Sequence, residues 1–153
     1  GYDIIMEVSL MLFLRACDQS DIPNAAQMLC RVYADAPYNE NWPLERAEKR
    51  ITWYLSGTNS RGYALIIDTQ IVGYLFGRII VAAKCSNFYV DDIFVHPNYQ
   101  RKGCGSMALE ALHDELKKDC INKIELHALR EDASFYEKNG FSKSNYVNME
   151  KKL

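Results

Sequence analysis

Apolar, β-branched runs alternate along the chain with amphipathic helical patterns, and this alternation limits the folds that the sequence can adopt. The helical periodicity predicts helices over 22–33, 44–55, 105–118 and 132–139. The expected strands cover 9–16, 61–68, 70–82, 87–95, 122–128 and 146–153, with a hairpin at Asp68-Thr69 between the second and the third. Strands alternating with helices indicate an α/β (α+β) domain built on a central mixed sheet.

Length and composition narrow the class of protein further. At 153 residues we expect a single domain over 1–153, with residues 1–5 an appended segment before Met6. The net charge of −2 argues against nucleic acid as a partner, because nucleic-acid-binding domains usually carry a basic excess. The apolar stretch at 8–14 has only seven residues, too few to cross a bilayer, so no membrane partner is expected.

The cysteines bear on compartment and metal binding. There are five, an odd number, and none stands in a CxxC pair. This pattern is typical of free thiols in the cytoplasm and not of a disulfide framework or a zinc site. We therefore expect a cytoplasmic protein without a bound metal.

The stretch QRKGCGS, residues 100–106, follows an expected strand and leads into an expected helix. The first turn of a helix has unpaired N–H groups and a partial positive charge, which together bind anions. Gly103 and Gly105 allow the backbone to approach a ligand closely, and Arg101 and Lys102 add positive charge. The stretch therefore predicts a diphosphate site, the alternative being an ordinary turn with solvated basic residues. A Walker loop is excluded because no lysine stands between Gly105 and Ser106, and the dinucleotide fingerprint lacks its third glycine, since Ala108 stands there.

The segment VDDIFVHPNYQRKGCGSMALEAL resembles the central motif of the GNAT superfamily, the acetyl-CoA-dependent N-acetyltransferases. Gln100, Gly103 and Gly105 fill its Q/R-x-x-G-x-G/A signature. FYEKNGF at 135–141 is similar to the later motif of the family, and LFLRACDQSDIPNAAQML at 12–29 is similar to its opening strand and helix. The resemblance implies the GNAT fold, a mostly antiparallel mixed sheet of about seven strands flanked by about four helices.

The resemblance also implies acetyl-CoA as the coenzyme, with coenzyme A as the product. The turn would bind its pyrophosphate, and the strand before the turn would lie along its pantetheine arm. Carried over by position, Phe94 and Val95 would contact pantetheine. The residues expected around the pyrophosphate are Gln100, Arg101, Lys102, Gly103, Cys104, Gly105 and Ser106.

Asp91 and Asp92 are candidates for the base that an attacking amine needs. Strand alternation predicts that they point to opposite faces of a strand that is otherwise apolar, where a carboxylate is costly unless it is used or paired. The resemblance favours Asp91, because polyamine-acetylating relatives show a carboxylate at the matching place. The alternative is that either residue is solvated or salt-bridged at the start of the strand.

Tyr136 matches the usual general acid of the family, which protonates the coenzyme thiolate. The alternative role is packing of a short helix onto the sheet. On the acceptor side, the YNENWPLERA stretch is similar to a segment of aminoglycoside 6′-N-acetyltransferases. Tyr38, Glu40 and Trp42 would there bind a cationic amine through cation–π and carboxylate contacts, unless this region is simply a packed helix pair with a charged outer face.

These inferences predict direct transfer of acetyl from acetyl-CoA to a primary amine of a small cationic substrate, such as an aminoglycoside or a polyamine. N-acetylation of a peptide or protein is the alternative within the same chemistry. A non-catalytic sensor that binds acyl-CoA is the alternative from another class. A homodimer is a further expectation.

Overall fold

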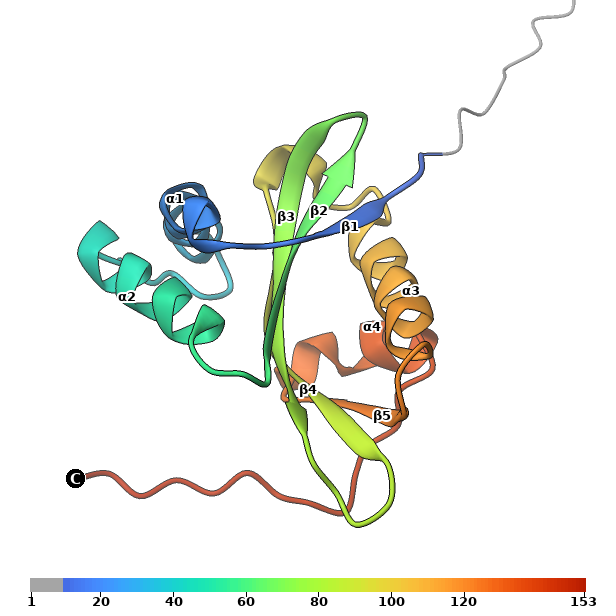
Figure 1. Cartoon of the computed structure of the whole chain (residues 1–153). Coiled ribbons are helices and arrows are strands. Elements are labelled where there is room, and N and C mark those ends of the chain that lie inside the picture. The colour runs from blue at the N-terminus through green and yellow to red at the C-terminus, as the bar shows by residue number, and fades with distance from the viewer. Residues whose placement is uncertain (1–9) are drawn as a thin grey trace, which may run out of the picture.

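One open sheet forms the centre of the molecule in the computed structural model, which describes residues 10–153 (Figure 1). Its order is β1-β2-β3-β4-β5, antiparallel at every junction except the parallel β4–β5 pair. The strands are β1 (Phe13–Ala16), β2 (Ser60–Ile67), β3 (Gln70–Ile80), β4 (Ser86–Val95) and β5 (Ile121–Leu126). This confirms the expected mixed α/β (α+β) class. The expected appended segment 1–5 lies outside the described residues.

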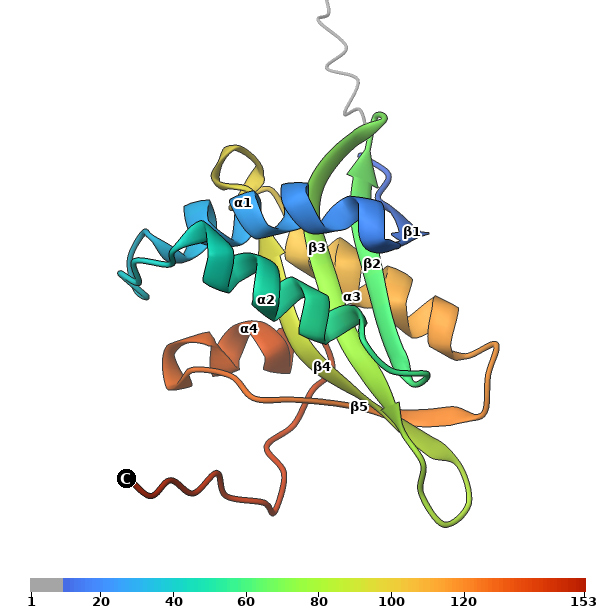
Figure 2. The same cartoon turned by 60° about the vertical axis from the view of Figure 1, so that its left-hand side comes forward.

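Helices form a layer on each side of the sheet (Figures 1 and 2). The layer on one face contains α1 (Ile22–Tyr33) and α2 (Leu44–Leu55). The other contains α3 (Cys104–Leu116) and α4 (Ala133–Lys138). Short 3₁₀ turns cover Gln19–Asp21, Pro97–Tyr99 and Arg130–Asp132. Asp68 and Thr69 both have positive φ, 47° and 66°, which is the backbone of the tight two-residue hairpin that the sequence predicts between β2 and β3.

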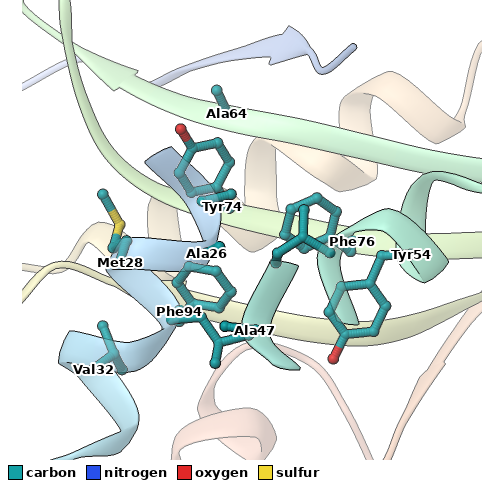
Figure 3. Close-up of a cluster of buried hydrophobic side chains, with 12 residues drawn as sticks. Ala26, Met28, Val32, Ala47, Tyr54, Ala64, Tyr74, Phe76 and Phe94 are labelled. Carbon is teal, nitrogen blue, oxygen red and sulfur yellow. The ribbon is translucent and has the colours of Figure 1, made fainter. Parts of the chain in front are cut away.

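The core between the sheet and α1–α2 is rich in aromatic side chains (Figure 3). Tyr74, Phe76 and Phe94 line the sheet and are at most 3% exposed. Ala26 and Ala47, both fully buried, face them from the two helices and let the helix backbones come close to the rings. Burial of each aromatic side chain contributes about 1.5–3 kcal/mol. A second core, which includes Phe88, Val90 and Leu112, packs α3 against the opposite face. The aromatic core fixes where α1 and α2 lie over β4, and so positions the site described below.

The described residues contain five strands, fewer than the expected seven, and segment 146–153 is not a strand. It runs away from the sheet instead (Figures 1 and 2). Tyr146, Val147 and Met149 are each more than 80% exposed. An extended segment becomes a strand only when a neighbour pairs with its backbone, and none does so here within residues 10–153.

Over the described residues, we find no helix with the length and apolar character that crossing a membrane requires.

Candidate active site

A β-bulge in β4 decides where the two aspartates point. Phe76 of β3 pairs with Asp92 and the next residue, Gly77, pairs with Val90, so Asp91 is an extra residue without a partner on β3. A bulge resets the alternation of side chains along its strand. The prediction that Asp91 and Asp92 lie on opposite faces is therefore wrong: both point to the face covered by α1 and α2, as the contacts below show.

Asp91 is paired with an arginine from the neighbouring strand. Its carboxylate lies 3.4 Å from the guanidinium of Arg78, and its side chain is only 9% exposed. The guanidinium of Arg78 lies over the rings of Trp53 and Tyr89, 5.5 and 5.4 Å from their centroids. Asp91, Arg78 and Trp53 line a hollow of about 300 Å³ together with segment 56–60. Burial raises the pKa of Asp91, and the charge of Arg78 opposes that rise.

Asp92 is held by two tyrosines, one from each helix on that face. Tyr33 of α1 donates its hydroxyl to one carboxylate oxygen, and Tyr54 of α2 donates to the other at 2.8 Å. Burial raises the pKa of Asp92, while the two tyrosine hydrogen bonds and the charge of Arg50 oppose the rise. Burial and the carboxylate together hold the pKa of both tyrosines far above the usual range, so they act as permanent donors.

Tyr136 lies on α4. Its ring packs edge-on against Phe135 and Phe141, at centroid distances of 5.0 and 5.6 Å. Burial raises the pKa of Tyr136 to about 12, and the charges of Asp132, Tyr38 and Asp92 act in the same direction. Tyr136 keeps its proton at neutral pH and is available as a donor.

The outer edge of β4 is unpaired beside these side chains. β4 pairs with β5 only from Ser86 to Val90, and over residues 91–95 no strand in the described part of the chain lies on that side. The side chain of Phe94 is buried in the aromatic core, so only its main chain can contact a ligand. The carbonyl of Val95 accepts a hydrogen bond of 2.9 Å from the side chain of Gln100. Gln100 thus ties the following turn to the end of the strand.

The turn before α3 has the backbone that its glycines suggested. Arg101 and Gly103 have positive φ, 61° and 80°, and α3 begins at Cys104 without a side-chain cap on its first N–H groups. A Cβ added at Gly103 would meet nothing within 4 Å, so this side of the turn is open. Arg101 and Lys102 are exposed beside it. Uncapped N–H groups with two cations nearby can bind a phosphate group.

Cys104, Gly105 and Ser106 form the first turn of α3. Cys104 is buried, and burial raises the pKa of its thiol, which describes a packing residue and not a nucleophile. Ser106 is partly exposed. A Cβ at Gly105 would lie 3.0 Å from the ring of Phe135, so this glycine allows α4 to pack on the start of α3. Glycine at position 105 therefore serves the packing of α4 on α3, which the sequence did not reveal.

The three residues expected on the acceptor side have different surroundings. The ring of Tyr38 packs edge-on against that of Tyr33, with centroids 4.6 Å apart, which places Tyr38 beside the Asp92 cluster. Trp42 donates its indole N–H to Glu40 at 3.3 Å. The guanidinium of Arg50 lies 5.2 Å from the centre of the Trp42 ring, so one face of this ring already holds a cation.

Sequence reasoning missed Tyr54, Arg50 and Arg78 as parts of the site. A signal existed for Tyr54, which follows Ala47 and Ile51 on the buried stripe of α2. A tyrosine on such a stripe must find a partner for its hydroxyl. That partner, Asp92, is far away in the sequence, and the periodicity of α2 does not identify it. Among residues 10–153 no group of three or more potential metal ligands is present.

An uncapped helix start beside two cations, an unpaired strand edge and a cluster of proton donors and acceptors are features that a transferase with a phosphorylated coenzyme needs. The model of the acetyltransferase (GNAT) family matches residues 26–141, most of the chain, and the protein belongs to this family. It is an acetyl-CoA-dependent N-acetyltransferase. No curated protein sequence matches the chain.

Three solved structures with the same fold are similar to almost the whole chain. A possible acetyltransferase from Clostridium difficile 630 has a TM-score of 0.79 at 14% identity, covering 94% of this chain and 98% of its own. A predicted acetyltransferase with acetyl-CoA from Clostridium acetobutylicum has a TM-score of 0.71 at 19% identity, covering 92% and 96%. An aminoglycoside acetyltransferase from an uncultured soil metagenomic sample, in complex with sisomicin, has a TM-score of 0.70 at 19% identity, covering 94% and 97%.

Proposed function

We propose that the protein transfers acetyl directly from acetyl-CoA to a primary amine of a small cationic substrate, such as an aminoglycoside or a polyamine. The observation that carries this proposal is the negative charge around Tyr38. Burial raises the pKa of Tyr38, and the charges of Asp132, Asp92, Glu131 and Glu40 raise it further. Asp92 lies beside Tyr38, because Tyr33 packs edge-on against Tyr38 and donates to Asp92, and Glu40 is two residues from Tyr38 in the same loop. Such a concentration of negative charge attracts a polycation.

The chain offers a fitting place for the coenzyme. The uncapped start of α3, with Gly103 open and Arg101 and Lys102 beside it, would hold the pyrophosphate. The unpaired edge of β4 over 91–95 would hydrogen-bond the pantetheine arm through its main chain. When bound, acetyl-CoA supplies the acetyl thioester. The lack of a partner strand at this edge supports the placement, because free main-chain groups need a hydrogen-bonding partner.

We assign proton removal from the amine to Asp92 and not to Asp91. Asp91 is already paired with Arg78, and its contacts lie toward Trp53 and segment 56–60. Asp92 accepts hydrogen bonds from Tyr33 and Tyr54, and Tyr33 packs against Tyr38, so Asp92 lies beside the expected acceptor region. A raised carboxyl pKa makes Asp92 a better base than an ordinary aspartate, and the hydroxyl of Tyr33 gives a route for the proton to reach it.

Tyr136 is proposed as the acid at the end of the reaction. With a pKa of about 12 it is protonated at neutral pH, and its hydroxyl proton is the one offered to the leaving sulfur. In this proposal Asp92 of β4 accepts the proton that leaves the amine, and Tyr136 of α4 donates a proton to the coenzyme thiolate.

A panel of amines tests the substrate class. Release of coenzyme A thiol would be followed with an aminoglycoside, spermidine, a lysine-containing peptide and glucosamine 6-phosphate. We expect turnover of the first two, with a KM that rises with salt because screening weakens the attraction. Faster turnover of the peptide would favour the protein-acetylating alternative. Binding of acetyl-CoA without turnover of any amine would favour the sensor. Preference for glucosamine 6-phosphate, which carries negative charge, would contradict the role of the carboxylates.

We also propose that the protein is a homodimer. β5 is an edge strand, and its outer edge is unpaired within the described residues. Segment 146–153, whose sequence predicts a strand, exposes Tyr146, Val147 and Met149. Pairing of this segment with β5 of a second copy would satisfy both edges and cover these side chains. A cytoplasmic location stays a prediction.

A further inference from the structure

Cys85 and Cys120 meet where β4 and β5 begin. Their sulfur atoms lie 2.8 Å apart. Cys85 immediately precedes β4 and Cys120 immediately precedes β5. The N–H of Ser86 donates to the carbonyl of Cys120 at 2.9 Å, and Ser86 is the register partner of Ile121. The two cysteines are therefore lateral neighbours at the start of two parallel strands, a relation that their separation in the sequence concealed.

This arrangement meets the requirements of a disulfide. Neighbouring strands lie about 4.8 Å apart. Disulfide-bonded cysteines have Cα atoms about 4.4–6.8 Å apart and a bond of about 2.05 Å. The sulfurs at 2.8 Å would thus need to approach by less than about 1 Å. Cys120 is exposed and Cys85 is partly exposed, so an oxidant can reach the pair.

We propose that Cys85 and Cys120 form a reversible disulfide when the protein meets a peroxide or glutathione disulfide. With hydrogen peroxide, one cysteine thiolate attacks an oxygen and becomes a sulfenic acid, and hydroxide leaves to form water with the proton that the thiol released. The second thiol then displaces a second water and forms the S–S bond. Two thiols lose two electrons and two protons, and one peroxide becomes two waters. Glutathione disulfide gives the same bond by two exchanges that release two glutathione thiols.

The bond would lie next to the short ladder that, within residues 10–153, is the whole of the pairing of β5. β5 is an edge strand and pairs with β4 only over Ser86–Val90. A covalent link next to this short ladder restrains β5 in the unfolded chain and opposes fraying in the folded one. Oxidation should therefore raise the melting temperature by about 5–10 °C. Hydrogen exchange should slow mainly over residues 119–126.

Peptide mapping of the full chain tests the proposal. The protein would be incubated with glutathione disulfide, blocked with N-ethylmaleimide in denaturant so that buried thiols react, and digested without reductant. We expect a peptide pair linked through Cys85 and Cys120, with Cys17, Cys30 and Cys104 alkylated. Dithiothreitol should remove the link and restore the lower melting temperature. Cys85→Ser and Cys120→Ser should each abolish the link, and Cys30→Ser, whose native thiol donates to the carbonyl of Trp42, should keep it.

Two results would overturn the proposal. The first is that all five thiols stay free after equilibration with excess glutathione disulfide. The second is that the only disulfide joins Cys120 of one chain to Cys120 of another, seen as a reduction-sensitive dimer on a denaturing gel. The reduced variants must melt at the same temperature as the reduced wild type. If a serine variant does not fold, peptide mapping of the wild type alone still decides between the outcomes.

Discussion

Asp91 and Asp92 are consecutive in the sequence but have different partners: one pairs with an arginine and the other with two tyrosines. The bulge at Asp91 explains this, because it turns both carboxylates to one face and leaves them at different places along it. Arg78 neutralises Asp91, whereas Tyr33 and Tyr54 give Asp92 hydrogen bonds without a positive charge. Burial raises the pKa of Asp92 by more than its hydrogen bonds and the charge of Arg50 lower it, and this is the physical reason for assigning the base to Asp92.

The roles of the two aspartates can be separated by isosteric replacement. Asp92→Asn should lower kcat/KM by about 10²–10⁴-fold, the range of general base catalysis, with partial recovery at high pH where free amine accumulates. Asp91→Asn should leave a smaller defect, since it removes the partner of Arg78. Rates would be measured for both variants from about pH 6 to about pH 10, because amines with lowered and ordinary pKa values titrate over this range. A larger loss in Asp91→Asn would reverse the assignment.

Tyr54 should tune the pKa of Asp92. Its hydroxyl stabilises the charged carboxylate and so lowers a pKa that burial has raised. Tyr54→Phe removes that donor, the pKa rises further, and more of the base is protonated at a given pH. The acid side of the pH–rate profile should move to higher pH by about one unit.

Tyr63→Phe is the matched control for Tyr54→Phe. Tyr63 is also a buried tyrosine, but it belongs to the core that packs α3 against the sheet. The pH–rate profile of Tyr63→Phe should match that of the wild type. An unshifted acid side in Tyr54→Phe, with the fold intact, would mean that Asp92 is not the group that titrates in the rate.

Tyr136→Phe removes one hydroxyl and keeps the ring that packs against Phe135 and Phe141. Coenzyme binding should change little, because the turn at the start of α3 is untouched. The lost proton donor should lower kcat by about 10²–10⁴-fold, with a much smaller change in KM. Steady-state kinetics with an amine found in the panel, and titration of coenzyme A, measure the two effects. Near-normal turnover with chemistry rate-limiting would leave Tyr136 a packing residue.

The start of α3 depends on a backbone that only glycine adopts readily. Gly103 has φ of 80° with open space beyond it, so Gly103→Ala meets no clash and is disfavoured by its dihedral alone. We expect a loss of about 1–2 kcal/mol in stability if the turn keeps its shape. If the turn relaxes instead, the first N–H groups of α3 no longer point toward the pyrophosphate, and the affinity for coenzyme A falls. Calorimetric titration and thermal melting measure both.

Gly140→Ala separates these two effects of Gly103→Ala. Gly140 has φ of 88° and equally open space, but it follows α4 and lies outside the turn before α3. It should show a similar loss of stability with unchanged coenzyme affinity. Affinities equal to that of the wild type, together with no loss of stability in Gly103→Ala, would argue against pyrophosphate binding at the turn.

Strand β5 leaves one edge of the sheet without a partner strand within the described residues. The chain carries a strand-like segment, 146–153, that leaves the β5 edge uncovered. If two copies exchange this segment, light scattering should give twice the 17.6 kDa mass of one chain. Val147→Lys with Met149→Lys should give monomers, because charge on an edge strand prevents pairing. Lys151→Glu, a charge change in the same exposed segment, should remain dimeric. A wild-type monomer at micromolar concentration would rule out the exchange.

The order of the elements and the glycine turn before α3 were predictable from the sequence, because both depend on local chemistry. Apolar periodicity placed the four main helices and the strands β2 to β5 near their observed bounds. The hairpin at Asp68-Thr69 was also local, since the two residues themselves adopt its backbone. Gly103 and the helix that follows are adjacent in the chain, so a short motif was enough to indicate the turn.

The contacts between segments that are far apart in the sequence were decided only by the tertiary structure. The bulge is a property of the register between β3 and β4, and strand alternation read from β4 by itself therefore predicted the wrong face for one aspartate. Tyr54 meets Asp92, and Cys85 meets Cys120, only because the sheet and its helices bring separate segments together. Segment 146–153 has the pattern of a strand but no partner within the described chain. Side-chain pattern reports which residues prefer burial, whereas register and pairing depend on contacts that a single segment does not contain.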